Sequence, residues 1–459
     1  MGAQLIRADE AANSRPIWCV TAQNWREVSA ALHASARAFA ESSGFKAEAG
    51  VILVLPAADG AIAGVLFGCE EAPRDPLTFG KLATTLPSGD YHLARAPANP
   101  RLATLGFLLG AYRFTRYRKR NLPDLRLVVP EGIDRAEIER TAEAVTLTRD
   151  LVNTPANDLG PAEIEATARA LAARFGADIT VTTGDDLLAA NFPLIHAVGR
   201  ASTRAPRLID LSWGDPDAPK VTLVGKGVAF DTGGLDIKPP SGMLLMKKDM
   251  GGAAHVIGLA QMIMARGLKL RLRVIIPAVE NAIDGTAFRP GDIFPSRKGL
   301  SVEIGNTDAE GRLILADALT LADEEAPELL IDLATLTGAA RVALGPQLPP
   351  AYTDDETLAA DLARCAALEA DPLWRLPLWK PYASMLDSPI ADLNNAPGGG
   401  FAGSITAALF LERFVERAAS WLHIDIYAWN PSSRPGRPEG GEAQTIRALD
   451  ALLTERYGH

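Results

Sequence analysis

Short apolar runs alternate with longer stretches of helical apolar spacing from about residue 151 to the end of the chain. The runs that we expect to be strands are residues 208–213, 221–225, 270–277, 329–336 and 423–429. The stretches that we expect to be helices are residues 161–175, 251–266, 312–325, 354–369 and 404–419. Strands that alternate with helices in this way predict an α/β domain whose largely parallel sheet is covered by helices on both faces.

The first part of the chain indicates a second, smaller α/β unit. Three apolar runs, at residues 50–56, 61–67 and 124–130, are expected strands, and residues 25–41 have helical patterning. A helix predicted over about residues 134–151 would link the two domains. We place the boundary at 138/139, so that residues 1–138 form an N-terminal domain without a catalytic motif and residues 139–459 form the catalytic domain.

The charge balance limits the partners. The chain has 46 Lys and Arg residues against 56 Asp and Glu residues, a formal net charge of −10. Nucleic-acid binding needs clustered basic residues, and the basic cluster at residues 113–120 is interpreted as a solvated helix end. Nucleic acid is therefore not an expected partner. No run of about 18 uncharged apolar residues occurs, so no membrane span is expected.

Cysteine and histidine usage indicates the compartment and the type of metal site. Cys19, Cys69 and Cys365 lie far apart without a CxxC pair, which is typical of reduced thiols. The first residues lack the pattern of a secretory signal, so we expect a cytoplasmic protein. The six histidines form no HxH or HExxH pattern, so a histidine-built zinc site is not expected. We interpret His255 as a packed helix residue and not as a ligand.

The segment at residues 221–239, VTLVGKGVAFDTGGLDIKP, carries polar residues where a buried strand runs into a glycine-rich turn. Lys226, Asp231 and Lys238 lie there. Ligand sites of open α/β sheets lie at the carboxyl ends of strands, and glycines let the backbone approach a ligand closely. The phosphate-loop patterns GxxxxGKS, GxxxxGKT and GxGxxG are absent, and Asp231 would repel a phosphate unless a metal lay between them.

A second polar segment, VEIGNTDAEGRL at residues 302–313, leads into an apolar helix. Asp308 and Glu310 are two residues apart, and in an extended stretch such residues point to the same side. Two carboxylates side by side repel each other unless cations lie between them. Arg312 follows at the start of the helix, where its guanidinium could hold an anion.

Asp249, in MKKDMGGAA at the entry to a helix, has two interpretations. Taken alone, a residue there is more often a helix N-cap than a ligand. With the two segments above, it completes a set of four carboxylates that predicts a site for hard divalent cations. Four carboxylates balance two divalent ions, which can bridge and activate a water. Of Lys226 and Lys238, one could lose its proton and ligate while the other stabilises an oxyanion.

VGKGVAFDTGGLDIKP and NTDAEGRL resemble the two signatures of the leucyl aminopeptidase family, the M17 cytosol aminopeptidases. MKKDMGGAA and LVNTPANDLGP are similar to two further segments of that family, and YASMLDSPIADLNN is similar to a fifth. The resemblance covers about residues 145–429, whereas the first 140 residues are similar only in size and general α/β character.

The resemblance implies a metal-dependent aminopeptidase with two divalent ions in each subunit, Mn²⁺ or Zn²⁺, with Mg²⁺ and Co²⁺ as alternatives. The residues that would hold these ions are Lys226, Asp231, Asp249, Asp308 and Glu310. Asp231 and Glu310 would bridge both ions, Asp308 would complete one shell, and Lys226 with Asp249 would complete the other. A water bridging the two metals would attack the peptide, and Lys238 would polarise the scissile carbonyl and stabilise the oxyanion.

The same resemblance implies an anion site and a substrate pocket. Arg312, with backbone at Gly311 and Leu336, would hold a bicarbonate ion that acts as general base. The residues that would line the pocket for the first side chain are Met246, Thr335 and Gly338. The substrates would be peptides with a free N-terminus.

The family also implies an architecture for each part of the chain. The N-terminal domain would be macrodomain-like, and the catalytic domain would have a mixed, mostly parallel sheet with helices on both faces. Six subunits would form a homohexamer, arranged as a dimer of trimers.

The chain departs from the family near its C-terminus. Tyr427-Ala428 stands where the family usually has Ala-Gly, and residues 440–444, GGEAQ, stand where it usually has a Gly-Ala-Thr-Gly turn. This region helps to form the substrate pocket, so the sequence leaves the preferred N-terminal residue open.

Two other functions remain as alternatives at this point. The same fold could serve as a DNA-binding or scaffolding protein, for which residues 113–120 would be the contact. The chain could also be a phosphoryl hydrolase, because two-metal sites also catalyse the hydrolysis of phosphate esters. The lysine in the ligand set and the NTDAEGRL octapeptide disfavour a phosphoryl hydrolase.

Overall fold

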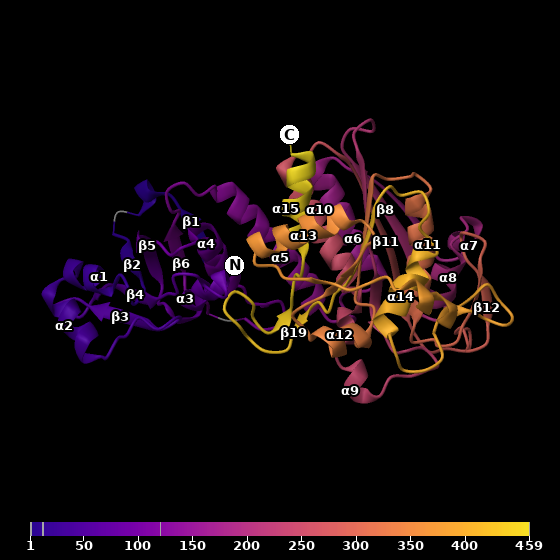
Figure 1. The fold of residues 1–459 in the computed structure, drawn as a ribbon, viewed down its shortest axis with the longest axis horizontal. Coiled ribbons are helices and arrows are strands. Elements are labelled where there is room, and N and C mark those ends of the chain that lie inside the picture. The colour runs from indigo at the N-terminus through magenta and orange to yellow at the C-terminus, as the bar shows by residue number, and fades with distance from the viewer. Residues whose placement is uncertain (1, 12, 120, 459) are drawn as a thin grey trace. The chain divides into compact units, whose positions relative to one another are not determined.

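The computed structural model describes residues 2–11, 13–119 and 121–458 (Figure 1). The chain divides into two compact units: the first comprises Met1–Thr146 with Ser432–Glu439, and the second comprises Leu147–Pro431 with Gly440–His459. Helix α5 (Arg135–Asn153) runs across the division at 146/147, and the boundary expected at 138/139 falls within the same helix. The chain therefore contributes to the first unit twice, at its start and again near its end.

The first unit is built on a six-stranded sheet in the order β1-β6-β5-β2-β4-β3, in which all neighbours are parallel except β3 and β4. Its strands are β1 (Ala3–Ile6), β2 (Arg15–Val20), β3 (Ile52–Pro56), β4 (Ile62–Gly68), β5 (Gly89–Arg95) and β6 (Leu125–Val128). Its helical elements besides α5 are η1 (Ala8–Glu10), α1 (Trp25–Ala31), α2 (Ala34–Ser42), η2 (Pro76–Lys81), α3 (Leu82–Thr85) and α4 (Pro100–Gly110). The single helix expected over residues 25–41 is two helices, because the backbone is extended at Leu32 before the side chain of His33 caps α2.

Ser432–Glu439 belongs to this first unit although it lies near the end of the sequence. Arg437 Nη1 forms an ion pair with Asp75 Oδ2 at 2.7 Å. A Cβ added at Gly80 would lie 2.5 Å from the backbone nitrogen of Gly436, so the segment passes directly against η2.

The second unit is built on a nine-stranded sheet in the order β16-β15-β18-β14-β9-β11-β8-β7, with β10 paired to β11. The pairs β15–β18, β8–β11 and β7–β8 are antiparallel and the other pairs are parallel, so the sheet is mixed and mostly parallel, as predicted. Its strands are β7 (Asp178–Thr183), β8 (Arg207–Trp213), β9 (Lys220–Gly225), β10 (Gly227–Asp231), β11 (Arg271–Asn281), β14 (Leu329–Ala334), β15 (Pro350–Tyr352), β16 (Trp374–Arg375) and β18 (Trp421–Asp425).

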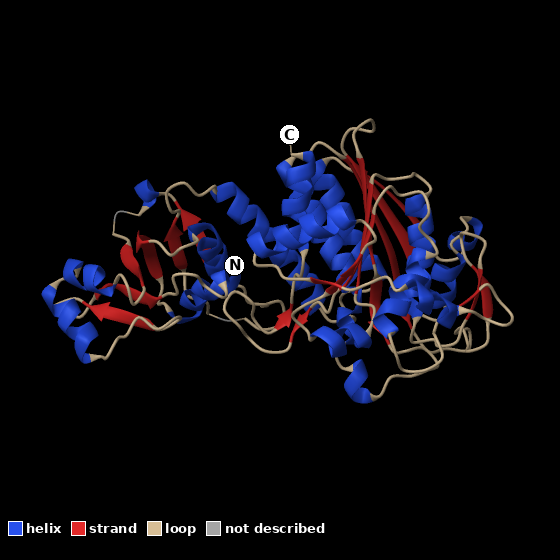
Figure 2. Ribbon diagram, viewed as in Figure 1, coloured by secondary structure: helices blue, strands red, loops and turns tan. Residues whose placement is uncertain are grey.

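Helices cover both faces of this sheet, as the alternating sequence pattern predicts (Figure 2). One face carries α6 (Pro161–Phe175), α10 (Gly251–Arg266), α13 (Glu356–Leu368) and α15 (Ile446–Tyr457). The other face carries α8 (Pro193–Gly199), α11 (Glu310–Asp323) and α14 (Gly403–Glu412). The shorter elements are α7 (Asp186–Ala189), α9 (Pro240–Met243), η3 (Met246–Met250), β12 (Ile293–Pro295), β13 (Ser301–Glu303), α12 (Gly338–Leu344), η4 (Lys380–Leu386), β17 (Leu393–Asn394), β19 (Trp429–Asn430) and β20 (Gly440–Gly441). Within the described residues, no helix is long and apolar enough to cross a membrane.

Strand β10 occupies the place where the sequence predicts a glycine-rich turn. β11 is long enough to pair with β9 over residues 271–275 and with β10 over residues 278–281. Lys226 is the single residue between β9 and β10, and its N–H donates to Leu333 O of β14 at 3.0 Å. The first polar segment therefore lies on the sheet itself, and Asp231 is the last residue of a strand.

Asp332 of β14 holds two side chains of the neighbouring strand β18. Trp421 Nε1 donates to Asp332 Oδ2 at 2.8 Å, and His423 Nδ1 lies 2.6 Å from Asp332 Oδ1. Asp332 and His423 are fully buried. Burial alone would lower the pKa of His423, but the Asp332 carboxylate outweighs burial and raises the pKa of the imidazole above its usual value.

We predict that this ion pair stabilises the second unit more at low pH than at high pH. Its contribution is fully present below the pKa of an unfolded histidine, about 6.5, and is lost as the pH rises through the raised pKa of the folded state. His423→Gln should therefore lower Tm more at about pH 6 than at about pH 9. Thermal unfolding of both proteins across this range measures the difference, and a difference in Tm that stays constant with pH would contradict the prediction.

Candidate active site

The polar residues singled out in the sequence gather at one edge of the nine-stranded sheet. β9, β14 and β18 are parallel to one another, so their carboxyl ends meet at this edge. Lys226 follows β9, Asp231 ends β10, and Thr335 follows β14. Ligand sites of open α/β sheets lie at such edges.

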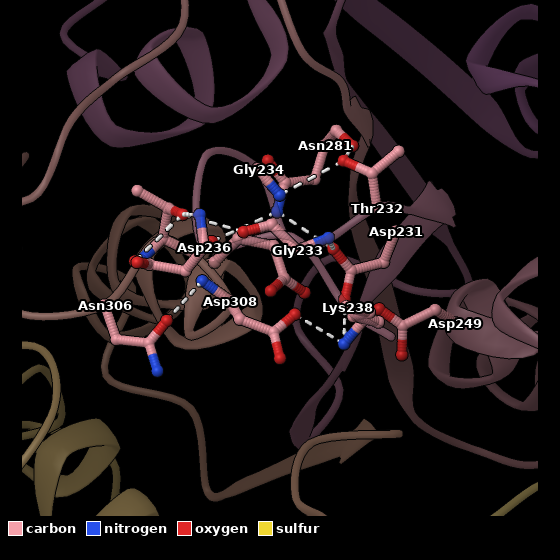
Figure 3. A network of polar contacts seen from close by, with 12 residues as sticks. Asp231, Thr232, Gly233, Gly234, Asp236, Lys238, Asp249, Asn281, Asn306 and Asp308 are labelled. Carbon is pink, nitrogen blue, oxygen red and sulfur yellow. Dashed lines mark hydrogen bonds and ion pairs between the residues drawn. The ribbon is translucent and has the colours of Figure 1, made fainter. Parts of the chain in front are cut away.

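Lys238 connects the first polar segment to the second. Its Nζ lies 2.8 Å from Asp231 Oδ2 and 2.5 Å from Asp308 Oδ1. Figure 3 shows these two carboxylates on either side of the ammonium group. Asp308 is fixed in its turn because its N–H donates to Asn306 Oδ1 at 2.7 Å.

Lys226 makes a second set of contacts with carboxylates and is only 3% exposed. Its Nζ lies 2.8 Å from Asp249 Oδ2 and 2.9 Å from Glu310 Oε1, and it donates to Thr335 O at 3.0 Å. The Thr335 hydroxyl donates to Asp249 Oδ1 at 2.8 Å. The residues that these contacts bring into one cluster are Lys226, Asp231, Lys238, Asp249, Asp308 and Glu310.

One expectation about the local structure is wrong, and one alternative is excluded. Asp308 and Glu310 do not share an extended stretch: Asp308 lies in a turn and Glu310 is the first residue of α11. The helix begins two residues earlier than predicted, and a carboxylate in the first turn of a helix is favoured by the helix dipole. Asp249 is not an N-cap, because α10 follows Met250 without a side-chain cap and the Asp249 carboxylate contacts Lys226 and Thr335 instead.

The carboxylate oxygens of the cluster suit hard cations. One oxygen each from Asp231, Asp308 and Glu310 lie within 4.8 Å of one another. In the part of the chain that the structure describes, Asp249 Oδ2, Asp308 Oδ1 and Glu310 Oε1 are buried and are held by lysine ammonium groups in ion pairs alone. Converging, buried carboxylate oxygens of this kind are ligands that Mg²⁺, Mn²⁺ and Zn²⁺ accept.

Burial and neighbouring charges shift the pKa values of several groups in the cluster. Burial and the Asp231 carboxylate raise the pKa of Asp308 to about 6 and that of Glu310 well above its usual range. For Lys226 and Lys238, burial acts to lower the pKa, but the surrounding carboxylates outweigh burial and raise it. Added positive charge would therefore favour the ionised forms of Asp308 and Glu310.

Arg312 lies beside the cluster in the first turn of α11 and is 7% exposed. Its Nη1 donates to Asn395 O at 2.6 Å, and among the described residues its Nε has no hydrogen-bond partner. Burial lowers the pKa of Arg312 to about 10, so the guanidinium remains charged at neutral pH. The backbone N–H of Leu336 donates to Asp425 Oδ1 at 2.9 Å.

Three residues that support the site were not predicted from the sequence. Asn281 ends β11, and its Nδ2 donates to Asp231 Oδ1 at 2.9 Å. Asn395 forms hydrogen bonds through both ends of its amide to the backbone of residues 305–309. Asp425 ends β18. Asn281 and Asp425 carry the signal of a polar residue at the end of an apolar strand, whereas Asn395 lies in a loop and its partners are distant in sequence.

The residues expected in the side-chain pocket lie around the same edge: Met246 begins η3, Thr335 follows β14, and Gly338 begins α12.

His255 is a packed helix residue, as predicted. It is fully buried in α10, its Nε2 accepts from the N–H of Gln444 and its Nδ1 lies 2.6 Å from Gly251 O.

In the basic cluster at residues 113–120, Arg113 donates to the backbone carbonyls of Gly110 and Tyr112. These are local contacts at the end of α4. Arg120 lies outside the described residues.

Comparisons with known proteins identify the family. Residues 146–450 match the cytosol aminopeptidase family, catalytic domain, and residues 16–130 match the M17 aminopeptidase, N-terminal domain. The probable cytosol aminopeptidase of Roseiflexus castenholzii is 43% identical over 370 residues, which cover 77% of this chain and 75% of that protein. The probable cytosol aminopeptidase of Rhizobium rhizogenes is 41% identical over 373 residues, which cover 77% of this chain and 74% of that protein.

Solved structures share the fold along almost the whole chain. The cytosol aminopeptidase from Coxiella burnetii has a TM-score of 0.94 and 46% identity, and the match covers 99% of both chains. The bottromycin maturation enzyme BotP in complex with Mn has a TM-score of 0.86 and 34% identity, covering 97% of this chain and 100% of that chain.

The two-domain α/β fold and the matches over both domains place the chain among the hydrolases that act on peptides. More specifically, the chain belongs to the cytosol aminopeptidase family, M17. It is a metal-dependent aminopeptidase, which acts on the N-terminal residues of peptides.

Gly311 approaches Lys226 so closely that a side chain would displace the lysine. A Cβ added at Gly311 would lie 2.4 Å from Lys226 Cε and 2.7 Å from its Nζ. We predict that Gly311→Ala moves the ammonium away from Asp249 and Glu310 and lowers kcat/KM for leucine 4-nitroanilide about a hundredfold, since small displacements in an active site are costly. Steady-state kinetics measure this loss.

The matched control is Gly242→Ala, because a Cβ added at Gly242 meets no atom closer than 3.5 Å. This variant should keep the wild-type kcat/KM. An unchanged kcat/KM in Gly311→Ala would show that the close approach of Gly311 to Lys226 does not matter for the site.

Proposed function

We propose that this chain releases single N-terminal residues from peptides with a free N-terminus, using two divalent metal ions and a bicarbonate ion. The observation that carries the proposal is the carboxylate cluster at the sheet edge, where oxygens of Asp231, Asp308 and Glu310 converge within 4.8 Å. Asp249 and two lysines complete the cluster.

The side chains that would hold the metals are Lys226, Asp231, Asp249, Asp308 and Glu310. Mn²⁺ and Zn²⁺ are the proposed ions, with Mg²⁺ and Co²⁺ as alternatives, and the structure of BotP in complex with Mn supports Mn²⁺. Two bound divalent ions supply an activated water at neutral pH and positive charge against a developing oxyanion. Lys226 is charged while Asp249 and Glu310 surround it, and added cations would lower its pKa so that a neutral amine could ligate.

Lys238 would polarise the scissile carbonyl and stabilise the oxyanion. Asp231 and Asp308 hold its ammonium at 2.8 and 2.5 Å, which fixes its position before substrate binds. The same carboxylates raise the pKa of Lys238, so it remains protonated at neutral pH. A fixed cation aimed at the carbonyl oxygen stabilises the negative charge that forms there in the transition state.

Arg312, with backbone at Gly311 and Leu336, would hold the bicarbonate. Its guanidinium is charged, buried and free at Nε among the described residues, and such a group binds a planar anion with two hydrogen bonds. The Leu336 N–H already donates to Asp425, so it would share its hydrogen between the two acceptors. Arg312 would thereby keep a general base beside the reacting water.

The substrate pocket and the assembly follow the family resemblance. Met246, Thr335 and Gly338 would line the pocket for the first side chain, and all three lie at the edge that carries the cluster. Peptides are the proposed substrates, and a homohexamer arranged as a dimer of trimers is the proposed assembly.

Asp308→Asn and Glu310→Gln should each weaken Mn²⁺ binding by at least about a hundredfold, because residues that only support metal ligands already cost ten- to a hundredfold when changed. Isothermal titration of metal-free protein with Mn²⁺ measures the affinity. Asp186→Asn removes an exposed carboxylate on α7 and should bind Mn²⁺ as the wild type does.

Hydrolysis of leucine 4-nitroanilide should stop when a chelator removes the metal and should return when Mn²⁺ is added. Full activity in the presence of the chelator would rule out the metal mechanism.

Arg312→Met should abolish the response of the enzyme to bicarbonate. Wild-type kcat should rise when bicarbonate is added to degassed buffer, whereas the variant, which cannot hold the anion, should show a kcat about a hundredfold lower and no rise. Mn²⁺ binding should remain as in the wild type, which separates loss of the anion from damage to the metal ligands. A bicarbonate response that persists in Arg312→Met would disprove the assignment of the anion to this residue.

A further inference from the structure

Two cationic side chains contact the ring of Tyr427, next to the proposed side-chain pocket. Lys248 Nζ lies 4.7 Å from the ring centroid, and Arg341 Cζ lies 5.3 Å from it. Lys248 follows Met246 by two residues in η3, and Arg341 follows Gly338 by three residues in α12. The elements that carry the pocket residues therefore carry the two cations as well.

Neither cation forms an ion pair with a carboxylate in the described ranges of the chain. Lys248 is only 5% exposed, and in the described residues neither its side chain nor that of Arg341 forms an ion pair or a hydrogen bond. The nearby carboxylates are already used: Asp249 contacts a lysine and a threonine, and Asp425 accepts hydrogen bonds from residues 336–337. Two like charges beside one ring repel each other, and a buried cation without an anion is costly.

The backbone at Tyr427 is held in place. The N–H groups of Tyr427 and Ala428 both donate to Gln444 Oε1 at 2.9 Å. Ala428 is fully buried in a left-handed conformation with φ of 57°, and a Cβ added at Gly251 would lie 2.7 Å from the Ala428 Cβ. The backbone that carries the ring therefore cannot shift without disturbing the start of α10. We call Lys248, Arg341 and Tyr427 together the cationic wall.

We propose that the cationic wall binds a carboxylate on the side chain of the substrate's first residue, so that this aminopeptidase prefers N-terminal glutamate or aspartate. The inference rests on the proposed function, because it names the substrate class of the same site. Arg341 offers a planar guanidinium that can bind a carboxylate with two hydrogen bonds, and Lys248 offers N–H donors from a second element. Bound carboxylate would also relieve the repulsion between the two cations.

The geometry places the wall beside the first side chain. Arg341 Nη2 lies 4.0 Å from the position of a Cβ at Gly338, so the guanidinium is folded back over the start of α12. Arg341 and Tyr427 also line the same small pocket. A peptide has another carboxylate at its C-terminus, but we assign the side-chain carboxylate because both cations accompany the residues proposed to line the first pocket.

The test compares kcat/KM of the Mn²⁺-loaded full-length protein for the 4-nitroanilides of glutamate, glutamine and leucine. Glutamate and glutamine have the same shape, so their ratio isolates the charge. The wild type should prefer glutamate over glutamine by about tenfold or more, the size expected for hydrogen bonds to a charged group. Arg341→Met and Lys248→Met should each reduce this ratio several-fold while the leucine substrate is still cleaved.

The matched control is Lys247→Met, which removes the neighbouring lysine, whose Nζ donates to Asn153 O. This variant should keep the wild-type ratio of glutamate to glutamine. Arg341 is exposed, so Arg341→Met tests the inference even if replacement of the buried Lys248 impairs folding.

Other outcomes would overturn the inference. Cleavage of leucine and glutamine substrates with no preference for glutamate would overturn it and leave the proposed function intact, as would an unchanged ratio in both variants. Cleavage of none of the substrates would overturn the proposed function and the inference together. A preference for the dipeptide Gln-Ala over its C-terminal amide, lost in Arg341→Met, would assign the wall to the C-terminal carboxylate and overturn the side-chain assignment.

Discussion

The repulsion among four carboxylates at one sheet edge governs the structure around them. Carboxylates brought this close and buried need compensating positive charge nearby. Lys226 and Lys238 supply it, each placed between two carboxylates. Gly311 leaves the space that the Lys226 side chain fills, and Asn281 orients Asp231. The backbone is thus shaped to bring cations and carboxylates together at a place where a ligand can reach them.

The proposed site separates charge of opposite sign. Its inner part carries carboxylates, and the proposed side-chain pocket lies next to Lys248 and Arg341, whose side chains form no ion pair among the described residues. In one orientation, a substrate would place its positive α-amino group near the carboxylates and a negative first side chain near the two cations. In the reverse orientation, like charges would face each other and oppose binding. Electrostatic complementarity of this kind contributes to specificity as well as to affinity.

Much of this could be predicted from the sequence, because strand ends carry local signals. The alternation of apolar runs and helical patterns predicts the layered sheet, and the polar residues at the ends of β9 and β10 indicate the site. The local geometry could not be predicted as well: Asp308 and Glu310 converge through a turn and a helix start, not an extended strand. Asn395 was not predicted for a related reason, since its hydrogen bonds reach back across 89 and 90 residues to a turn that sequence spacing does not reveal.

The return of Ser432–Glu439 to the first unit has a consequence for synthesis of the chain. A ribosome makes the polypeptide from its N-terminus, so Asp75 emerges long before Arg437, its ion-pair partner. The small unit can form its sheet early, but its surface at η2 is completed only when almost all of the catalytic unit has been made. Domains generally fold as units while the chain emerges. Here the first unit to emerge is among the last to be finished, and a nascent chain that stops before residue 432 leaves the Asp75 carboxylate without its ion-pair partner.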